Sequence, residues 1–326
     1  LTMATYKGIK GVKVVTKASD PTASEADGTV WYNSTGDALK YSIASAGAWS
    51  SGGSMANNKW KMAGMGIQTA ALIAGGQRPP GNVDDSETYD GTSWTEVNNI
   101  NTARRGLPGV GTQTAGMIMG GFPGALDVVE QYDGTSWSEK NDLLTGRQWS
   151  GAAGTTTAAL FWSGYTAPGT ANSALTEKWD GTSWSEVNDL NTARYYARSA
   201  AGISTAALAI GGWIYPSGPK TQAVEEYDGT SWSEKNDLNE AKEMRIACGT
   251  STAALVYGGG PATGATEKYD GTSWTEVGDL ATARSQLGGA TAAPSGVALA
   301  VGGAPYTDVT EEWNDPVYTI KTVTVS

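Results

Sequence analysis

Six cationic side chains recur at one position of a repeated pattern and could bind an anion. Each stands ten residues after a tryptophan, and each directly precedes a stretch of small residues that is expected to form a strand. If the repeats surround one axis, these cations would gather at one end of it, where clustered positive charge attracts carboxylates. One hypothesis is therefore a site for an acidic glycan or acidic peptide, made by Lys59, Arg104, Arg147, Arg194, Lys242 and Arg284.

The same cations have an alternative partner inside the repeat. An aspartate stands five residues before four of them, and such an ion pair would brace neighbouring repeats instead of binding a ligand. These aspartates are Asp142, Asp189, Asp237 and Asp279. Because the aspartates recur almost as regularly as the cations, this structural role is the stronger interpretation.

The chain contains no histidine. Imidazole general-base catalysis, Ser-His-Asp triads and histidine-ligated zinc or copper are therefore excluded. Two carboxylates could still hydrolyse a glycan, but almost every acidic residue recurs at a fixed repeat position, as expected of structural charges. We expect no enzymatic activity, no metal and no cofactor. A carboxylate-based glycan-degrading enzyme is the remaining catalytic alternative.

Two sequence motifs define the repeat that would position these residues. Tyr-Asp-Gly-Thr-Ser-Trp occurs at 89–94, 132–137, 179–184, 227–232 and 269–274, with Trp179 replacing tyrosine in the third copy. A threonine- and alanine-rich run that ends in glycine, paired in five copies, occurs six times, and a decayed sixth copy of the first motif surrounds Trp313. The motif tryptophans are 42 to 48 residues apart, a period typical of propellers and related arrays.

Each repeat is predicted to supply four strands. Short apolar runs stopped by glycine, such as 207–210, indicate a strand buried on both faces. The next segment alternates polar and apolar residues and meets Asp-Gly, a strong hairpin signal because this turn needs positive φ. The tryptophan begins the third of these strands, and the small-residue stretch after each cation is the fourth.

The five aspartates of the Asp-Gly turns could also be interpreted as a calcium array. No dense set of oxygen ligands follows them, so a role in the turn itself is favoured. They are Asp90, Asp133, Asp180, Asp228 and Asp270.

The pattern from Trp49 to Trp313 resembles the kelch repeat, in which a glycine doublet closes one strand and an aromatic residue and a tryptophan follow at fixed spacing. The resemblance implies an all-β fold, a six-bladed kelch-like β-propeller with the tryptophan strand outermost. It also implies arginines at the mouth of the central channel that hold acidic ligands. The repeats here are richer in alanine and threonine than is usual for the family.

Residues 49–326 are assigned to this propeller, and two segments compete to complete its last blade. Trp49 occupies the outer-strand tryptophan position without a full repeat before it, so the strand near Trp49 is favoured to pair beside the strand of Trp313. The β-branched, alternating segment 317–325 is the competitor, either beside that strand or in its place.

Residues 1–48 are predicted to form an N-terminal extension with a short β-hairpin at 28–41. Its sequence Gly-x-x-Trp-Tyr-Asn-Ser-Thr, followed by Leu-Lys-Tyr, resembles hairpins of bacteriophage tail and appendage proteins. Together with the repeats, it resembles virion structural proteins known mainly from marine phages. The resemblance implies a place on the surface of the phage particle, as a tail fibre or as a tail or head appendage or decoration. Residues 1–48 would contact other virion proteins, and self-association is left open.

Composition narrows the partners. A formal net charge of −11 argues against binding a nucleic-acid backbone, and no stretch approaches the roughly 18 apolar residues of a membrane span, so no membrane insertion is expected. Cys248 is the single cysteine, which rules out an intrachain disulfide, and we expect it to be buried in an inner strand.

Variable loops follow the paired glycines, and the residues that recognise a ligand usually lie on such loops. In one of them, Trp213 and Tyr215 could form an aromatic platform for a sugar, or could simply cover the edge of a blade. The leading hypothesis is a non-enzymatic virion structural protein that displays these loops for adhesion to a host surface or glycan. The main alternative is a pure assembly module with no host ligand.

Overall fold

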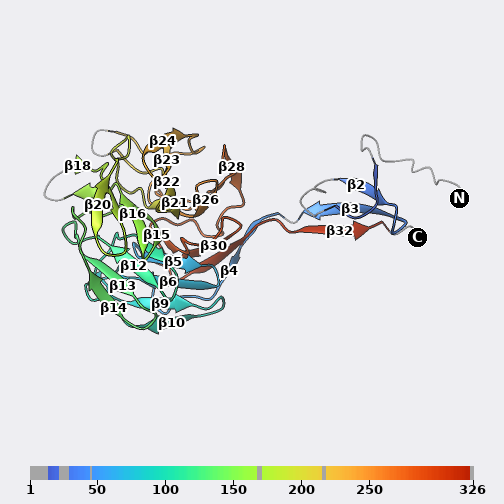
Figure 1. The fold of residues 1–326 in the computed structure, drawn as a ribbon. Coiled ribbons are helices and arrows are strands. Elements are labelled where there is room, and N and C mark those ends of the chain that lie inside the picture. Colours follow the sequence, from blue (N-terminus) through green and yellow to red (C-terminus); the bar gives the residue numbers. More distant parts are fainter. Residues whose placement is uncertain (1–13, 22–28, 45, 167–170, 215–217, 324–326) are drawn as a thin grey trace. The chain divides into compact units, whose positions relative to one another are not determined.

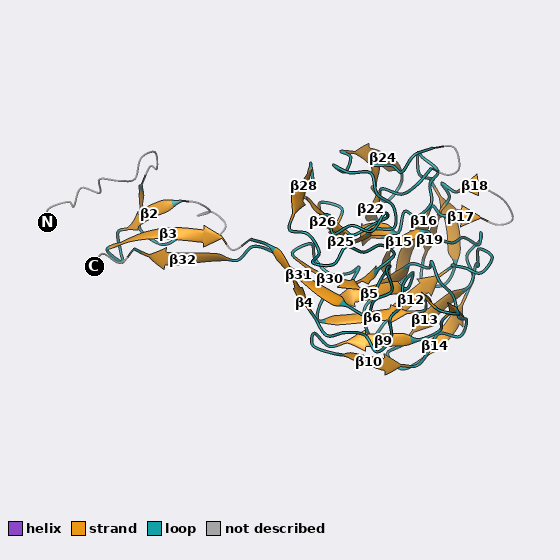
Figure 2. Ribbon diagram, turned by 180° about the vertical axis from the view of Figure 1, so that it is seen from behind, coloured by secondary structure: helices purple, strands orange, loops and turns teal. Residues whose placement is uncertain are grey.

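The computed structural model describes residues 14–21, 29–44, 46–166, 171–214 and 218–323. These residues form strands and loops only, as Figure 2 shows, and contain no helix that could span a membrane. Contacts divide the chain into two compact units. We call Trp49–Asn314 the repeat unit, and Leu1–Ala48 together with Asp315–Ser326 the terminal unit.

The described part of the repeat unit contains six four-stranded sheets. From inner to outer strand, the first sheet contains β5 (Ala63–Ile67), β6 (Ala70–Ala74), β9 (Ser86–Tyr89) and β10 (Trp94–Val97). The second contains β11 (Gly109–Gly111), β12 (Gly116–Met119), β13 (Val129–Tyr132) and β14 (Trp137–Lys140). The third contains β15 (Gly151–Thr155), β16 (Ala158–Trp162), β19 (Thr176–Trp179) and β20 (Trp184–Val187). The fourth sheet contains β21 (Ser199–Ile203), β22 (Ala206–Ile210), β23 (Val224–Tyr227) and β24 (Trp232–Lys235). The fifth contains β25 (Ile246–Thr250), β26 (Ala253–Tyr257), β27 (Thr266–Tyr269) and β28 (Trp274–Val277). The sixth contains β29 (Gly288–Gly289), β30 (Val297–Val301), β31 (Thr310–Asn314) and β4 (Ala48–Ser51).

The inner strands contact one another in chain order. β5 contacts β11, β11 contacts β15, and β15 contacts β21. β21 in turn contacts β25, β25 contacts β29, and β29 contacts β5. In Figure 1 the outer strands β10, β14, β20, β24 and β28 lie around the rim, while β5, β15 and β21 lie nearer the middle. The unit is therefore all-β and propeller-like.

The motif aromatics fill the gaps between sheets. Tyr132 and Trp137, from the second sheet, are buried against Leu72 and Met65 of the first, and the same relationship recurs along the chain. Within one sheet, Tyr132 and Trp137 are also cross-strand partners that flank the Asp-Gly turn. Two large aromatic side chains are buried in each of four sheets, while Trp94 and Trp49 are partly buried in the other two, which explains why the motif is repeated so closely.

Motif tryptophans also donate hydrogen bonds to the preceding sheet. The Nε1 atoms of Trp49, Trp94 and Trp232 donate to threonine Oγ1 atoms at 3.1, 2.9 and 3.1 Å, in Thr266, Thr310 and Thr176 respectively. Each of these threonines begins the third strand of its sheet. In the second sheet the equivalent position is Val129, which begins the third strand and has no hydroxyl group. Trp184 packs against this sheet, and its buried Nε1 atom has no hydrogen-bond partner.

The sixth sheet joins strands from distant parts of the repeat unit. β4 is hydrogen-bonded beside β31, as the position of Trp49 predicted. The Trp49 ring lies 4.8 Å from that of Tyr257 and 5.7 Å from that of Trp313. The amide of Gln68 adds a link between the first and sixth sheets by donating to the carbonyl oxygens of Ala298 and Trp313 at 3.1 and 2.7 Å.

The terminal unit is a separate four-stranded sheet in the order β1 (Val15–Lys17), β2 (Val30–Asn33), β3 (Ala38–Ala44) and β32 (Tyr318–Thr322). β2 and β3 form the antiparallel hairpin expected at 28–41, of which residue 28 lies outside the described residues. The segment 317–325 was the competitor for the last strand of the repeats, and its residues 324–325 lie outside the described residues. Its strand β32 pairs with β3, because its alternating β-branched residues meet an available strand edge there.

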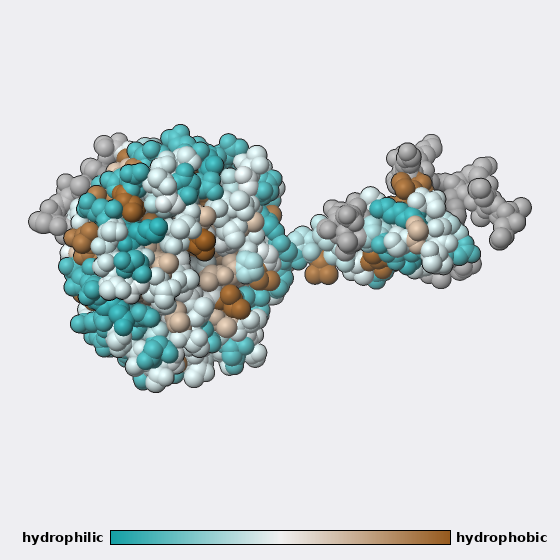
Figure 3. Space-filling view, viewed as in Figure 1, coloured by the Kyte–Doolittle hydropathy of each residue, from teal (hydrophilic) through white to brown (hydrophobic). Residues whose placement is uncertain are grey.

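Two short ladders extend the loops after the paired glycines, β7 (Gln77–Arg78) with β8 (Gly81–Asn82), and β17 (Tyr165–Thr166) with β18 (Ala171–Asn172). On the face of the repeat unit seen in Figure 3, hydrophobic residues lie in small separate groups among hydrophilic ones. That face offers no single broad apolar surface.

Candidate functional site

Five of the six predicted cations are buried in ion pairs with glutamates. Their nitrogen–oxygen distances are 2.7 to 3.2 Å, and both side chains of each pair are at most 2 % exposed. The pairs are Lys59–Glu87, Arg104–Glu130, Arg147–Glu177, Arg194–Glu225 and Arg284–Glu311. These cations therefore do not form an open collar for a ligand, and their partners are not the aspartates that the spacing suggested.

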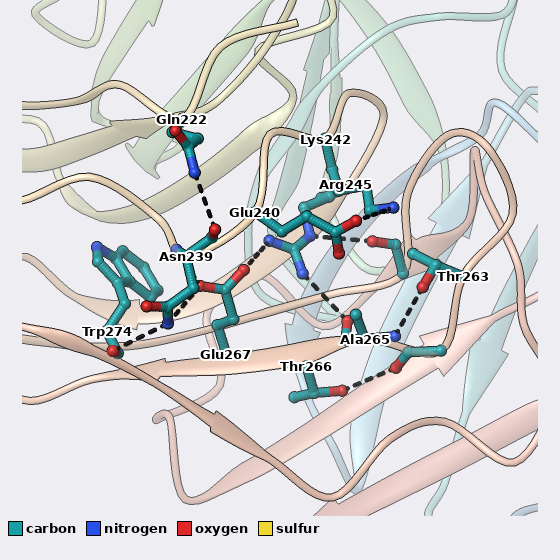
Figure 4. A network of polar contacts seen from close by, with 12 residues as sticks. Gln222, Asn239, Glu240, Lys242, Arg245, Thr263, Ala265, Thr266, Glu267 and Trp274 are labelled. Carbon is teal, nitrogen blue, oxygen red and sulfur yellow. Dashed lines mark hydrogen bonds and ion pairs between the residues drawn. The ribbon is translucent and has the colours of Figure 1, made fainter.

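The fifth sheet uses a different residue for its pair. Lys242, at the predicted position, contacts the half-exposed Glu240 at 2.6 Å. Arg245 takes the buried place instead, with Nη1 2.7 Å from Glu267 Oε1. Figure 4 shows this pair among its neighbours. The ion pair is thus a feature of all six sheets, although the cation of one sheet is shifted by three residues.

The glutamates tie each sheet to the segment that leads into it. While one carboxylate oxygen contacts the cation, the other accepts a backbone N–H at 2.6 to 2.9 Å, from Ala56, Asn101, Leu144, Asn191, Asn239 and Ala281. Burial lowers the pKa of Arg147 and Arg194, and the charge of the paired glutamate opposes this effect. A periodic glutamate two residues before each motif aromatic was the sequence signal for this partner.

The turn aspartates have a local role. Each Oδ1 accepts the backbone N–H groups of the second and third following residues at 2.8 Å. These hydrogen bonds lower the pKa of all five carboxyls. Among the described residues, no group of three or more acidic or cysteine side chains is arranged to hold a metal ion. Cys248 is buried in β25, with Sγ 3.9 Å from the carbonyl oxygen of Pro294.

A ring of six residues lies where the chain enters the inner strands, two positions after each predicted cation. We call Lys61, Gly106, Trp149, Tyr196, Met244 and Gln286 the entrance ring. All have positive φ, between 56° and 68°. The N–H of Trp149 donates to Gly106, that of Gly106 to Lys61 and that of Lys61 to Gln286, each at 2.8 Å. The N–H of Gln286 donates to Met244, and that of Met244 to Tyr196, at 3.3 and 3.4 Å.

The residue before each member of the entrance ring forms a bridge to the loop after the paired glycines. These bridges join Trp60 to Gln77, Arg105 to Phe122, Gln148 to Tyr165, Tyr195 to Trp213, Glu243 to Gly260 and Ser285 to Ala304. Both positions differ from repeat to repeat, whereas the neighbouring cation and strand residues recur. Five non-glycine residues with positive φ also store strain, which tends to gather at functional sites. The entrance ring and these bridging residues are therefore the candidate binding site.

Aromatic side chains cover part of this site. The ring centroids of Trp149 and Tyr196 are 4.9 Å apart, and those of Tyr196 and Tyr195 are 4.2 Å apart. Trp213, predicted as a platform residue, stacks on Tyr195 at 5.6 Å with an interplanar angle of 23°. Its predicted companion Tyr215 lies outside the described residues. The aromatic run therefore leads from one loop to the entrance ring.

Three cations that the repeat pattern did not single out lie at the same place. Lys61 Nζ donates to Gln77 Oε1 at 3.0 Å and lies 5.4 Å from the Trp149 ring. Arg105 Nη1 donates to Asn82 Oδ1 at 2.9 Å. Burial, followed by the charges of Arg105 and Arg198, lowers the pKa of Lys61 to about 8.

Arg198 extends into the space between the inner strands. Its side chain is 6 % exposed, and Nη2 donates to the carbonyl oxygen of Met62, just before β5, at 2.5 Å. Beyond Arg198 lies a water-sized space of about 10 Å³, which Arg198 lines together with Gly64 and Ile246. A larger cavity of about 350 Å³ follows between the far ends of the inner strands, and its lining contains no titratable side chain.

Comparison with models of known protein families and with curated proteins finds no match for this chain.

Proposed function

We propose that the repeat unit is a closed, six-bladed, kelch-like β-propeller and that the protein is a non-enzymatic adhesion module of a phage virion. Its entrance ring and the adjoining loops would bind a glycan of the host surface. The closed propeller is supported by the order of the inner-strand contacts, which returns from β29 to β5. It is also supported by the pairing of β4 beside β31.

The observation that carries the binding function is the aromatic run from Trp213 through Tyr195 and Tyr196 to Trp149. Aromatic faces supply large contact areas with little conformational freedom to lose, which suits the apolar face of a sugar ring. Trp149 and Tyr195 are each only 8 % exposed, so Tyr196 and Trp213, which are partly buried, offer the accessible faces of the run. Equivalent positions of the repeats carry different residues, as expected of a site selected for recognition. Glu243 is the one carboxylate among the entrance-ring and bridging residues, so a pair of catalytic carboxylates is not provided there.

The place in a virion rests on the resemblance of the repeats and of the hairpin at 28–41 to phage structural proteins. Within that proposal, the terminal unit contacts other virion proteins. Val15, Ile43 and Val317 of this unit are between 44 and 64 % exposed, and apolar side chains at such positions suit a protein interface. This observation also favours the assembly module as the second candidate function.

A glycan array with the full-length protein tests the proposal. We expect binding to host-surface glycans, and we expect Trp213→Ala and Tyr196→Ala each to weaken the strongest signal about tenfold in a follow-up titration. Tyr318→Ala, in the terminal unit, is the matched aromatic control and should bind like the wild type. Absence of any glycan binding, or binding that both ring variants retain, would leave assembly as the better account.

A further inference from the structure

The three cations of the entrance are not balanced by acidic groups. In the part of the chain that the structure describes, no carboxylate lies within 4.0 Å of the charged nitrogens of Lys61, Arg105 or Arg198. Glu243 is nearby, but it contacts Lys220 at 3.2 Å. Each cation of the six buried ion pairs, by contrast, has its own glutamate, although Arg104 and Arg194 also keep buried nitrogens without a hydrogen-bond partner.

Buried polar atoms around the entrance also lack hydrogen-bond partners. They include the Nε atoms of Arg105 and Arg198, the Oε1 atom of Gln286 and the Oε2 atom of Glu243. A buried polar atom without a partner carries a desolvation cost, and an unpaired buried guanidinium is particularly unfavourable. An anionic group of a ligand would accept from the two Nε atoms, and a ligand hydroxyl would donate to Gln286 Oε1.

Arg198 breaks the repeat, which argues that it serves more than the fold. Arg194 precedes Ser199, the strand partner of Ile210, by five residues. The position equivalent to Ser199 in the third sheet is Gly151, the strand partner of Trp162. Arg147 precedes Gly151 by four residues. The fourth sheet therefore carries one extra residue here, the kind of insertion that re-aims a side chain near a functional site. The inserted arginine is held by its bond to Met62.

We infer that the entrance ring binds a carboxylate-bearing sugar, with Lys61, Arg105 and Arg198 contacting the carboxylate and Tyr196, which packs on the buried Trp149, contacting the sugar ring. This inference rests on the proposed function. Guanidinium groups match the two oxygens of a carboxylate in a fixed fork geometry. Trp149 lies within 5.4 Å of Lys61 Nζ and within 4.9 Å of the Tyr196 ring, so the charged and aromatic contacts are adjacent.

Calorimetric titration of the full-length protein with a uronic acid and with a sialic acid, each compared with its methyl ester, tests the inference. We expect one of these acids to bind about tenfold to a hundredfold more tightly than its ester. Arg105→Gln and Arg198→Met should each remove most of that difference while the melting temperature is retained. Lys235→Gln is the control, since Lys235 on the outer strand β24 pairs with Glu226 of β23, away from the entrance ring, and carries the same charge.

The outcomes separate the two proposals. Equal binding of acids and esters, lost on Tyr196→Ala but not on Arg105→Gln, would overturn the carboxylate site and leave glycan adhesion standing. Inorganic phosphate that competes as well as the acid would also overturn the assignment to a sugar carboxylate. Failure of every sugar and glycan to bind would overturn both proposals.

Discussion

Arg245 Nη1 lies 2.7 Å from Glu267 Oε1, and both side chains are 1 % exposed. In the other five sheets, the equivalent glutamate pairs with the cation ten residues after the tryptophan, which here would be Lys242. The geometry of the buried pair is thus kept while the residue that supplies the charge has moved. Arg245 also donates to the carbonyl oxygens of Gly258 and Ala265 at 3.0 and 3.2 Å, which fixes the planar guanidinium.

Arg245→Ala is therefore expected to lower the free energy of unfolding by about 3–5 kcal/mol, because Glu267 would stay buried without its partner. Lys242→Ala, whose partner Glu240 is half-exposed, should cost about 0–1 kcal/mol. Chemical denaturation of the two variants measures both values. A larger effect at Lys242 than at Arg245 would contradict the assignment.

Val129→Thr is expected to stabilise the protein. The new hydroxyl would stand where Thr176 and Thr310 accept from Trp232 and Trp94, and it would supply an acceptor for the unpartnered Nε1 of Trp184. One added hydrogen bond of this kind contributes about 0.5–1.5 kcal/mol. Thermal unfolding measures the gain. Val129→Ala, which removes volume and adds no acceptor, is the control and should destabilise.

Two arginines should respond in opposite ways to replacement by methionine. Arg147→Met leaves Glu177 buried and unpaired, so the free energy of unfolding should fall by about 3–5 kcal/mol. Arg198→Met removes a buried guanidinium that has no carboxylate partner among the described residues, so stability should be unchanged or higher. Chemical denaturation of both variants gives the comparison. A loss at Arg198 as large as that at Arg147 would mean that Arg198 is a structural residue.

Lys61 should titrate near pH 8. Its pKa is lowered by burial and by the charges of Arg105 and Arg198, while Tyr196, with a pKa raised to about 12, stays protonated in this range. Glu243 and Lys220 are the other charged groups facing Tyr196 and the adjoining loop. NMR of ¹³C-methylated lysines should give a midpoint of about 8 for Lys61, and Arg105→Gln should raise it.

The same titration has a consequence for binding and for stability. Since Lys61 loses its charge as the pH rises through about 8, affinity for an anion should fall over that range. The unfolded chain keeps the proton up to the ordinary lysine pKa, so the free energy of unfolding should rise between these two pH values. A Lys61 signal that stays charged to pH 10 would contradict both expectations.

The turn aspartates should make the fold sensitive to acid. Their folded-state pKa values are lowered by the backbone hydrogen bonds of the turn, so their contribution is present above the unfolded value of about 3.9 and is lost as the pH falls through the folded values. The melting temperature of a variant with Asp90, Asp180 and Asp270 changed to Asn should depend less steeply on acid pH. A slope in this variant as steep as that of the wild type would contradict the contribution of the turn aspartates.

The local features of this protein were readable from the sequence. Alternation, glycine stops and Asp-Gly turns act over a few residues, and the strands and hairpins they predicted are present. The position of Trp49 within the repeat spacing likewise predicted that β4 lies beside β31. The ligand-binding role predicted for the six cations was wrong, because five of them are buried in ion pairs with glutamates and Lys242 contacts Glu240.

Tertiary structure decided which acidic residues pair with those cations and which acidic residues do not. Glutamates and aspartates recur with the same period, so for Arg147 the spacing alone did not separate the partner Glu177 from the candidate Asp142. Only the antiparallel register, which brings a third-strand glutamate beneath the segment leading into the inner strand, makes the choice. The shift from Lys242 to Arg245, the pairing of β32 with β3 and the projection of Arg198 toward Met62 depend in the same way on contacts between residues distant in sequence. Periodicity fixes what the repeats share, whereas a binding site depends on how they differ once they are packed together.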